Sequence, residues 1–300
     1  MNAEVGQTIA AESRFRRFVA SYTENKVPVV ALFVFLSIVF VALLSPWISP
    51  QNPYDLSQIN IIDGCLVPGS MGTSGMTYLL GTDDQGRDIL SAIFYGLRIS
   101  LAVGAASNLF AFLIGLGLGL IAAYFSGKIG DFIMRIVDLQ LSFPAILVAL
   151  ILLAVLGRGT EKVILALIVA VWARYARIVY GSALSERERE YIDAAKCLAL
   201  SQPRIIFRHL LPNCLPPLIV VGSVNIAYSI LLEATLSFLG VGLPVTEPSL
   251  GLLVANGYQF ILSGRYWISF FPGVALLIAV GSLNLVTDRL RDVLNPRLQR

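Results

Sequence analysis

The stretch "EYIDAAKCLALSQPRIIFRHLLPN", from Glu190 to Asn213, is a polar run in a chain that is otherwise strongly apolar. Hydrophobic residues make up 56% of the 300-residue sequence and charged residues only 14%. A soluble domain usually carries about 25% charged residues. Long apolar segments flank the run on both sides. This pattern predicts an all-α, polytopic membrane protein with the polar run outside the bilayer.

Six segments are apolar enough to cross a membrane, because a helical span needs about 20 apolar residues. They cover residues 27–45, 99–125, 136–156, 163–179, 215–232 and 267–286. Each of them either lacks charged residues or carries them near one end. The sequence therefore predicts six transmembrane helices.

The distribution of Lys and Arg predicts the orientation, because cytoplasmic segments carry an excess of both. With the N-terminus inside, the inside segments hold four, two, seven and four basic residues, which is 17 of the 22 in the chain. The outside segments hold only Arg87, Arg98, Arg158, Lys162 and Arg265. Both termini and the polar run are therefore predicted to be cytoplasmic.

Within the polar run, the sequence predicts two short helices. Ser185 and Glu188 form an S-x-x-E capping box, so a first helix is expected to begin at Glu186. A second is expected to begin after Ser201 or Gln202 and to end at Pro212.

The first of these helices has a face of mostly small side chains. Its members are spaced at i, i+3, i+4 and i+7, which places them on one side of a helix. They are Tyr191, Ala194, Ala195 and Leu198. A partner could approach the backbone closely at such a face. The pattern alone fits either an ordinary solvated loop or a docking element for a cytoplasmic partner.

Several chemistries are excluded by what the sequence lacks. His209 is the only histidine, which leaves no histidine-based metal site and no Ser-His-Asp triad. The nearest approach to a phosphate-binding loop is "SGK" at 126–128, which lacks the first glycine and the final Ser or Thr. The net charge is only +3, and the sequence has no cluster of basic residues that would suggest a nucleic-acid partner. We expect a chain that is not an enzyme and binds no metal or cofactor.

The polar run resembles the EAA loop of ATP-binding-cassette importer permeases. That loop begins with an acidic residue followed by two alanines. Three residues later comes a glycine, and a Leu-Pro pair follows further along the chain. Here "DAA" stands at 193–195 and "LP" at 211–212, and the departure is Ala199 in the glycine position. Glycine readily adopts a positive φ, so this departure concerns the turn after the first helix.

Four other stretches resemble the C-type permease subunit of dipeptide, oligopeptide and nickel importers. They are "LGTDDQGRDILSAIFYGLRISLAVG" (80–104), "LSFPAILVAL" (141–150), "EATLSFLGVGLP" (233–244) and "NLVTDRLRDVLNPRL" (284–298). The resemblance runs from about residue 27 to the C-terminus. Two departures are Leu250, where tryptophan is frequent, and "VTDRL", where "LGDGL" is common.

The resemblance implies the type I importer permease fold and its mechanism. In such importers the EAA loop is a coupling helix seated in a groove of a cytoplasmic ATPase. Two ATPases hydrolyse ATP with Mg²⁺, and their closure moves the spans. The resemblance also implies a paralogous B-type permease, an extracytoplasmic substrate-binding protein and the bacterial plasma (inner) membrane. It assigns the ATPase contacts to Tyr191, Asp193, Ala194, Ala195, Ala199, Leu200, Leu211 and Pro212.

The expected organisation follows from the spans and the resemblance. Residues 1–26 form a cytoplasmic segment, 27–47 the first transmembrane helix and 48–98 an extracytoplasmic loop leading into the second helix. Residues 99–287 form the permease core with its coupling loop at 181–213, and 288–300 form a cytoplasmic tail.

Three functions compete for this chain. The favoured one is a permease subunit of an ATP-driven importer for di- or oligopeptides, with nickel or another chelated metal as the alternative cargo. A stand-alone secondary transporter would normally show intramembrane ionisable residues or an inverted repeat, and the sequence offers few of the former. An intramembrane enzyme would need acid–base groups that are missing.

On the outer side, Glu233 lies at the end of the fifth span. We expect it near the interface, where it is hydrated, with either a structural or a pathway role. In "GTDDQGRD", Thr82 and Gln85 are predicted to cap the helix toward the second span, since the spacing of a calcium loop is not met. The long outer loop is expected either to meet the binding protein, as the resemblance implies, or to be simply mobile.

Gly115 and Gly119, four residues apart in the second span, allow another helix to approach closely. That helix could belong to this chain or to another subunit.

Overall fold

The computed structural model describes residues 14–294 except 126, 245 and 248. The predicted N-terminal segment and C-terminal tail therefore lie partly outside the described residues. The elements are α1 (Arg14–Thr23), α2 (Lys26–Ile48), η1 (Ile61–Asp63), β1 (Ser70–Met71), β2 (Thr77–Tyr78), α3 (Ile89–Tyr124), α4 (Lys128–Ser142), α5 (Ala145–Leu156), α6 (Thr160–Arg187), α7 (Glu190–Cys197), α8 (Gln202–Arg204), η2 (Ile205–Leu210), α9 (Leu211–Phe238), α10 (Leu250–Tyr258) and α11 (Trp267–Leu294).

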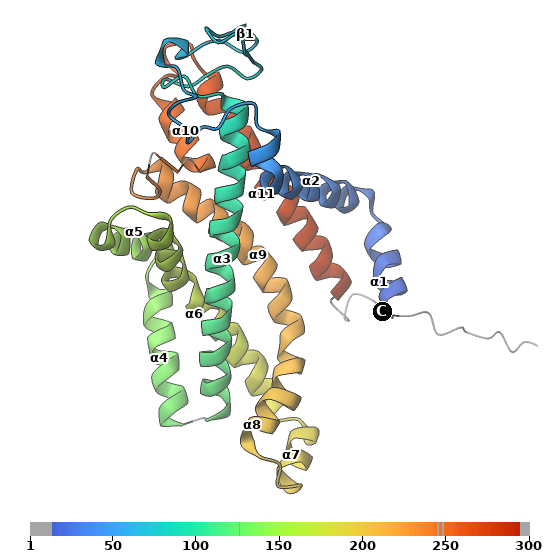
Figure 1. Cartoon of the computed structure of the whole chain (residues 1–300). Helices are drawn as coiled ribbons and strands as arrows, with labels where there is room; N and C mark the ends of the chain where they lie inside the picture. Colours follow the sequence, from blue (N-terminus) through green and yellow to red (C-terminus); the bar gives the residue numbers. More distant parts are fainter. Residues whose placement is uncertain (1–13, 126, 245, 248, 295–300) are drawn as a thin grey trace, which may run out of the picture.

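The predicted spans are present as five helices and one bent pair. Within the described residues, α2, α3, α6, α9 with the short segments before it, and α11 are each long and apolar enough to cross a membrane. Helices α4 and α5 together would make the sixth span, but they meet at 90°. In Figure 1 the small β1–β2 sheet lies at one end of the bundle and α7 at the other, called here the β1 end and the α7 end.

The bend between α4 and α5 has a local cause in the sequence. Pro144 lacks a backbone N–H and restricts the residue before it to extended conformations. Phe143 accordingly has φ −99° and ψ 139°, which ends α4. The predicted continuous span over 136–156 is therefore two helices, and α5 leaves α4 about halfway along the bundle (Figure 1).

Helices α3 and α6 form the most extensive helix–helix contact in the described chain. Gly115 and Gly119 are buried in it, against the backbone of α6 near Trp172 and Ala176. This confirms that the glycine pair is a packing seam within the chain. With 36 residues, α3 is roughly 54 Å long and extends beyond a 30 Å hydrocarbon core.

The loop between α2 and α3 is ordered around Asp63, which is only 2% exposed. Its carboxylate accepts hydrogen bonds from the backbone and hydroxyl of Thr73 and lies 3.4 Å from the Tyr78 hydroxyl. The indole nitrogen of Trp267, at the start of α11, donates to the carbonyl of Thr82 over 3.3 Å. The bonds of Asp63 hold the loop together, and the bond from Trp267 attaches it to the bundle.

The predicted cap of α3 by Thr82 and Gln85 is wrong. The Thr82 hydroxyl instead donates to the carbonyl of Asp63 over 2.6 Å. Asp88 is the N-cap, because its carboxylate accepts from the backbone N–H of Ser91 at 2.9 Å. The helix begins later than the capping-box pattern indicated.

At the α7 end, the predicted helix start at Glu186 is also wrong. Helix α6 continues through Ser185 to Arg187, so Ser185 lies inside a helix and caps nothing. Helix α7 begins at Glu190 after the N-cap Arg189, whose side chain makes no capping bond.

The predicted helix end at Pro212 is wrong as well, because α8, η2 and α9 form one continuous helical span. Residues 205–210 are a π-helix. Pro212 lies in the first turn of α9, and its ring would clash with the carbonyl four residues earlier in a regular α-helix. The wider π turn gives this carbonyl room, so the proline is accommodated without a break.

Candidate functional site

Residues 188–210 project from the α7 end of the bundle and are called here the projecting loop (Figure 1). A small cluster holds the loop together, in which Ile192, Ala195 and Ile205 are buried. Tyr124, the last residue of α3, packs against this cluster together with Leu200. The loop is therefore a packed extension of the bundle.

Hydrogen bonds connect the loop to the two spans beside it. The Tyr191 hydroxyl donates to the carboxylate of Glu186 at 2.7 Å and accepts from the Asn213 amide at 3.0 Å. Partial burial, and then the bond to Glu186, raise the pKa of Tyr191 to about 12, so the hydroxyl keeps its proton. Arg187 donates to the carbonyl of Ala123 at the end of α3 over 2.7 Å, which suits the negative end of that helix.

The accessible face of α7 differs from the predicted one. Tyr191, Ala194 and Leu198 are exposed, as predicted for a docking face. Ala195 is only 4% exposed, because it lies on the same side as Ile192. The predicted four-residue face therefore offers three side chains to a partner.

The turn after α7 is as tight as a glycine would make it. Ala199 adopts φ +54°, in the left-handed region. The N–H of Ala199 bonds to the carbonyl of Lys196 at 2.9 Å, and that of Leu200 to the carbonyl of Ala195 at 3.2 Å. These two bonds form a Schellman motif, which satisfies the last carbonyls of α7. Alanine thus preserves the turn, at a strain of about 1–2 kcal/mol.

The remaining predicted contacts divide between solvent and core. Asp193 is exposed and pairs with Lys196 at 2.9 Å. Leu211 packs against the buried cluster of α3, α6 and α9, and Pro212 is exposed at the start of α9. The structure brings all these residues to one end of the molecule, but Leu211 faces the core.

Sequence reasoning missed one exposed apolar residue of the projecting loop. Phe207 is 66% exposed, and Leu198, the C-cap of α7, is 74% exposed. Along the run that contains Phe207, Ile205 and Leu210 are buried. The spacing of those two buried positions could have identified Phe207 as the outward side chain.

Glu233 is fully buried, which corrects the expectation of a hydrated interfacial carboxylate. One carboxylate oxygen accepts from the Ser100 hydroxyl at 2.9 Å and the other from Ser237 at 2.7 Å. The backbone N–H of Leu250 lies 3.3 Å from the Ser100 oxygen. Glu233 therefore joins α9 to α3 and to the start of α10.

We expect Glu233→Ala to destabilise the protein by about 3 kcal/mol, because it creates a cavity and leaves buried hydroxyls without a partner. Glu233→Gln keeps the shape and one acceptor, so it should lose about 1 kcal/mol or less. Thermal unfolding of the purified protein measures both. If Glu233→Gln unfolded normally but abolished transport, the charge itself would be needed and the pathway role would apply.

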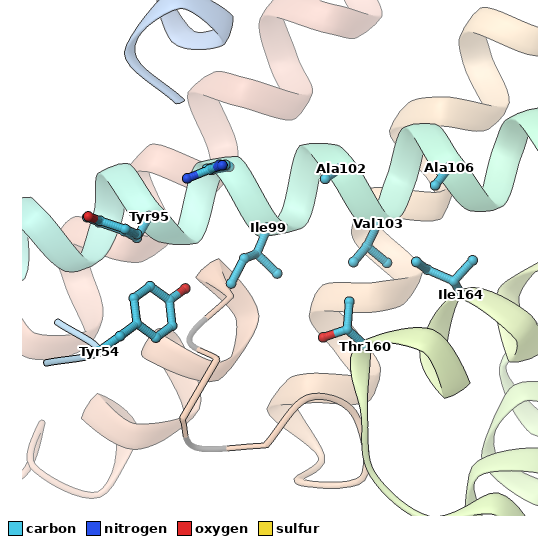
Figure 2. A pocket seen from close by; sticks show the side chains of 9 residues that line it. Tyr54, Tyr95, Ile99, Ala102, Val103, Ala106, Thr160 and Ile164 are labelled. Carbon is cyan, nitrogen blue, oxygen red and sulfur yellow. The ribbon is translucent and has the colours of Figure 1, made fainter. Parts of the chain in front are cut away.

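Two of the hollows along the described bundle include an arginine in their lining. The one nearer the β1 end has a volume of about 460 Å³. Figure 2 shows its lining, contributed by the loop after α2, by α3 and by the start of α6: Tyr54, Tyr95, Ile99, Ala102, Val103, Ala106, Thr160 and Ile164. The rings of Tyr54 and Tyr95 meet edge to face at 5.1 Å between centroids. Arg98 adds a single positive charge to this mostly apolar lining.

The second hollow, of about 390 Å³, lies at the bend between α4 and α5. Residues 140–145, Ala170 and Arg174 line it. The Arg174 guanidinium carbon is 4.1 Å from the centroid of the Tyr228 ring. Beside it, Arg177 and Asp138 form an ion pair. The sequence predicted that the charged residues of this span lie near its end. Helix α6 is longer than predicted, however, so Arg174 lies near its midpoint.

These features define a class of protein: a polytopic, α-helical membrane protein with a packed loop projecting from one end and an ordered loop at the other. Comparison with known proteins identifies the family. Residues 115–300 match the binding-protein-dependent transport system inner membrane components, and residues 13–64 match the N-terminal transmembrane domain of oligopeptide transport permease C. The chain belongs to the family of binding-protein-dependent transport system inner membrane components.

Individual relatives support the same family assignment. A putative peptide transport system permease protein of Brucella suis is 41% identical over 90% of this chain and 88% of its own length. The dipeptide transport system permease protein DppC of Escherichia coli is 38% identical over 93% of this chain and 92% of its own length. The predicted resemblance to C-type permeases is confirmed.

A solved structure supports the fold. A chain of the MetNI methionine ABC transporter, in an inward-facing conformation, matches with a TM-score of 0.57 and 22% identity. The match covers 69% of this chain and 98% of that chain. The predicted importer permease fold is therefore confirmed.

Proposed function

We propose that the chain is one of two permease subunits of an ATP-driven importer for di- or oligopeptides. The similarity to relatives named as dipeptide and peptide permeases, over about nine-tenths of the chain, is the observation that carries this proposal. The chain itself binds no ATP and catalyses no reaction in this scheme. Partner ATPases hydrolyse ATP with Mg²⁺.

The projecting loop is the proposed contact with one of two cytoplasmic ATPase subunits. Its support is the exposure of Tyr191 and Ala194 on α7, of Leu198 at its C-cap and of Phe207 in η2. Apolar side chains that are exposed on a tightly held loop are typical of a docking surface. Movement of the ATPases would pass through Arg187 and Tyr191 to α3, α6 and α9, which these residues join.

This assignment places the α7 end in the cytoplasm of a bacterium, both termini inside and the protein in the plasma membrane. The proposed organisation keeps a first span at 27–47, an extracytoplasmic segment at 48–98 that leads into α3, and the permease core at 99–287. A paralogous B-type permease completes the pathway. An extracytoplasmic binding protein docks at the β1 end, where Leu56, Ile61 and Ile62 are each about 80% exposed.

The test is purification followed by transport. The tagged chain, extracted in detergent, should co-purify with a second permease and two ATPase subunits. Liposomes that hold this complex and enclosed ATP should accumulate radiolabelled dipeptide when the loaded binding protein is added outside, and should not do so with a non-hydrolysable ATP analogue.

Two results would overturn the proposal. Accumulation of a nickel chelate, with no peptide uptake, would assign the alternative cargo. Purification of the chain alone, with uptake that needs no ATP, would assign a secondary transporter.

A further inference from the structure

The hollow at the α4–α5 bend has one ionisable side chain in its lining, that of Arg174. Arg174 lies near the midpoint of α6, a helix long enough to span a membrane. Charged residues at such depths usually face a water-filled path and take part in function. Binding sites of membrane transporters also recur where a helix is broken near the middle of the bilayer.

The charges in this region do not balance. Arg177 and Asp138 pair with each other, one residue on α6 and one on α4. Arg174, one turn away from Arg177, makes no ion pair with any residue that the structure describes, and its guanidinium lies over the Tyr228 ring. An aromatic face holds a cation but leaves its hydrogen-bond donors available. One positive charge therefore remains for an anion.

We propose that Arg174 binds the carboxylate of a peptide during its passage through this hollow. The inference rests on the proposed function and adds a contact within the membrane part. A guanidinium suits this role because its planar donors match the two oxygens of a carboxylate. The volume of about 390 Å³ admits a small peptide segment.

Polar and aromatic neighbours complete the site. Gln140 and Ser142 line the hollow from α4, and Phe143 lines it from the bend. The side-chain amide of Gln140 donates to the carbonyl of Val169 on α6 at 3.0 Å, which fixes the distance between the two helices. The Asp138–Arg177 pair lies one turn nearer the α7 end. Because its two charges cancel, it adds no net charge that would compete for the carboxylate.

Arg174→Gln in the complete transporter tests the inference. Uptake of radiolabelled alanyl-alanine into liposomes and ATP hydrolysis stimulated by the loaded binding protein are measured together. We expect uptake to fall about tenfold, as for loss of one charge-assisted contact, while stimulated hydrolysis stays within about twofold. The number of peptides moved per ATP therefore falls. Arg174→Lys should recover part of the uptake, since it keeps the charge and loses the planar donors.

Arg135→Gln is the matched control, because Arg135 is an exposed arginine of α4 that does not line the hollow. It should leave peptides per ATP unchanged. If Arg174→Gln left uptake normal, or lowered uptake and hydrolysis in proportion, the carboxylate contact would be refuted. If Arg174→Gln and Arg174→Lys both lost the second permease on purification, Arg174 would instead hold the two permeases together, and the inference would fail. A wild-type complex that moved no peptide would overturn the proposed function and this inference with it.

Discussion

Ala194→Arg is expected to abolish ATP-driven uptake while leaving the membrane part folded. Ala194 is exposed on α7, between Tyr191 and Leu198 on the same face. A long charged side chain here would hold a docked ATPase away from the helix and bury an unpaired charge at the contact. Such a charge costs about 3–5 kcal/mol, so we expect uptake and ATPase binding to fall by at least about a hundredfold. Co-purification of the ATPase subunits and uptake into liposomes measure the two losses.

The same substitution at Ala20 serves as the control for Ala194→Arg. Ala20 is an exposed alanine on α1, far from α7 in the chain. Ala20→Arg should retain the ATPases and at least about half of the uptake, as exposed substitutions usually do. Normal uptake by Ala194→Arg would contradict the proposed role of the projecting loop. Loss of folding by Ala194→Arg, seen as early thermal unfolding, would show that the residue supports the loop and would also count against the docking role.

Much of the membrane architecture could be predicted because hydropathy depends on composition over about 20 residues. The predicted spans match α2, α3, α6, α9 and α11, and most ends agree within about one turn. The exceptions are the start of α3 and the ends of α6, α9 and α11, where the helices are longer than predicted. The bend at Pro144 escaped prediction because the apolar character continues across it. Hydropathy measures how apolar a segment is, and it carries no information about a change in the direction of the helix axis.

Helix ends were less predictable than spans. Ser185 with Glu188 and Thr82 with Gln85 both match capping patterns, yet neither pair caps a helix. Tertiary packing decides between competing polar residues, and a one-dimensional pattern cannot rank them. Asp88 caps α3 because the Thr82 hydroxyl is already bonded within the loop between α2 and α3.

The candidate site was only partly visible in sequence. The projecting loop could be located from its motif, but the burial of Ala195 depends on Ile205 across the turn. Glu233 looked interfacial because it stands near the end of an apolar run. Its burial comes from α3, which is distant in the sequence, and from α10, which follows after a short loop. The role of Arg174 likewise needed the true length of α6 and the bend beside it.

Gly115→Ala is expected to destabilise the protein strongly, although alanine is the better helix former. A Cβ atom at Gly115 would lie 2.4 Å from the Cβ of Tyr175 and 2.6 Å from the carbonyl oxygen of Trp172. Both contacts are far inside van der Waals range, and the carbonyl belongs to a helix backbone that cannot move alone. Separating α3 from α6 also strains the buried bond between Tyr175 and Asn108, 2.5 Å long. We expect a loss of about 2–3 kcal/mol, measured as a thermal midpoint lowered by roughly 5–10 °C.

Gly117→Ala makes the same change two residues along α3, on the exposed side, where an added Cβ would have no neighbour within 4 Å. It should be neutral or stabilise the helix by about 0.5–1 kcal/mol, since glycine in a helix interior costs that much relative to alanine. The two variants share composition, helix and chemistry, so a difference between them reports the α3–α6 contact alone. If Gly115→Ala unfolded like the wild type, the close approach of α3 and α6 would be wrong. If Gly117→Ala destabilised the assembled transporter but not the isolated chain, the exposed side of α3 would be in contact with another subunit.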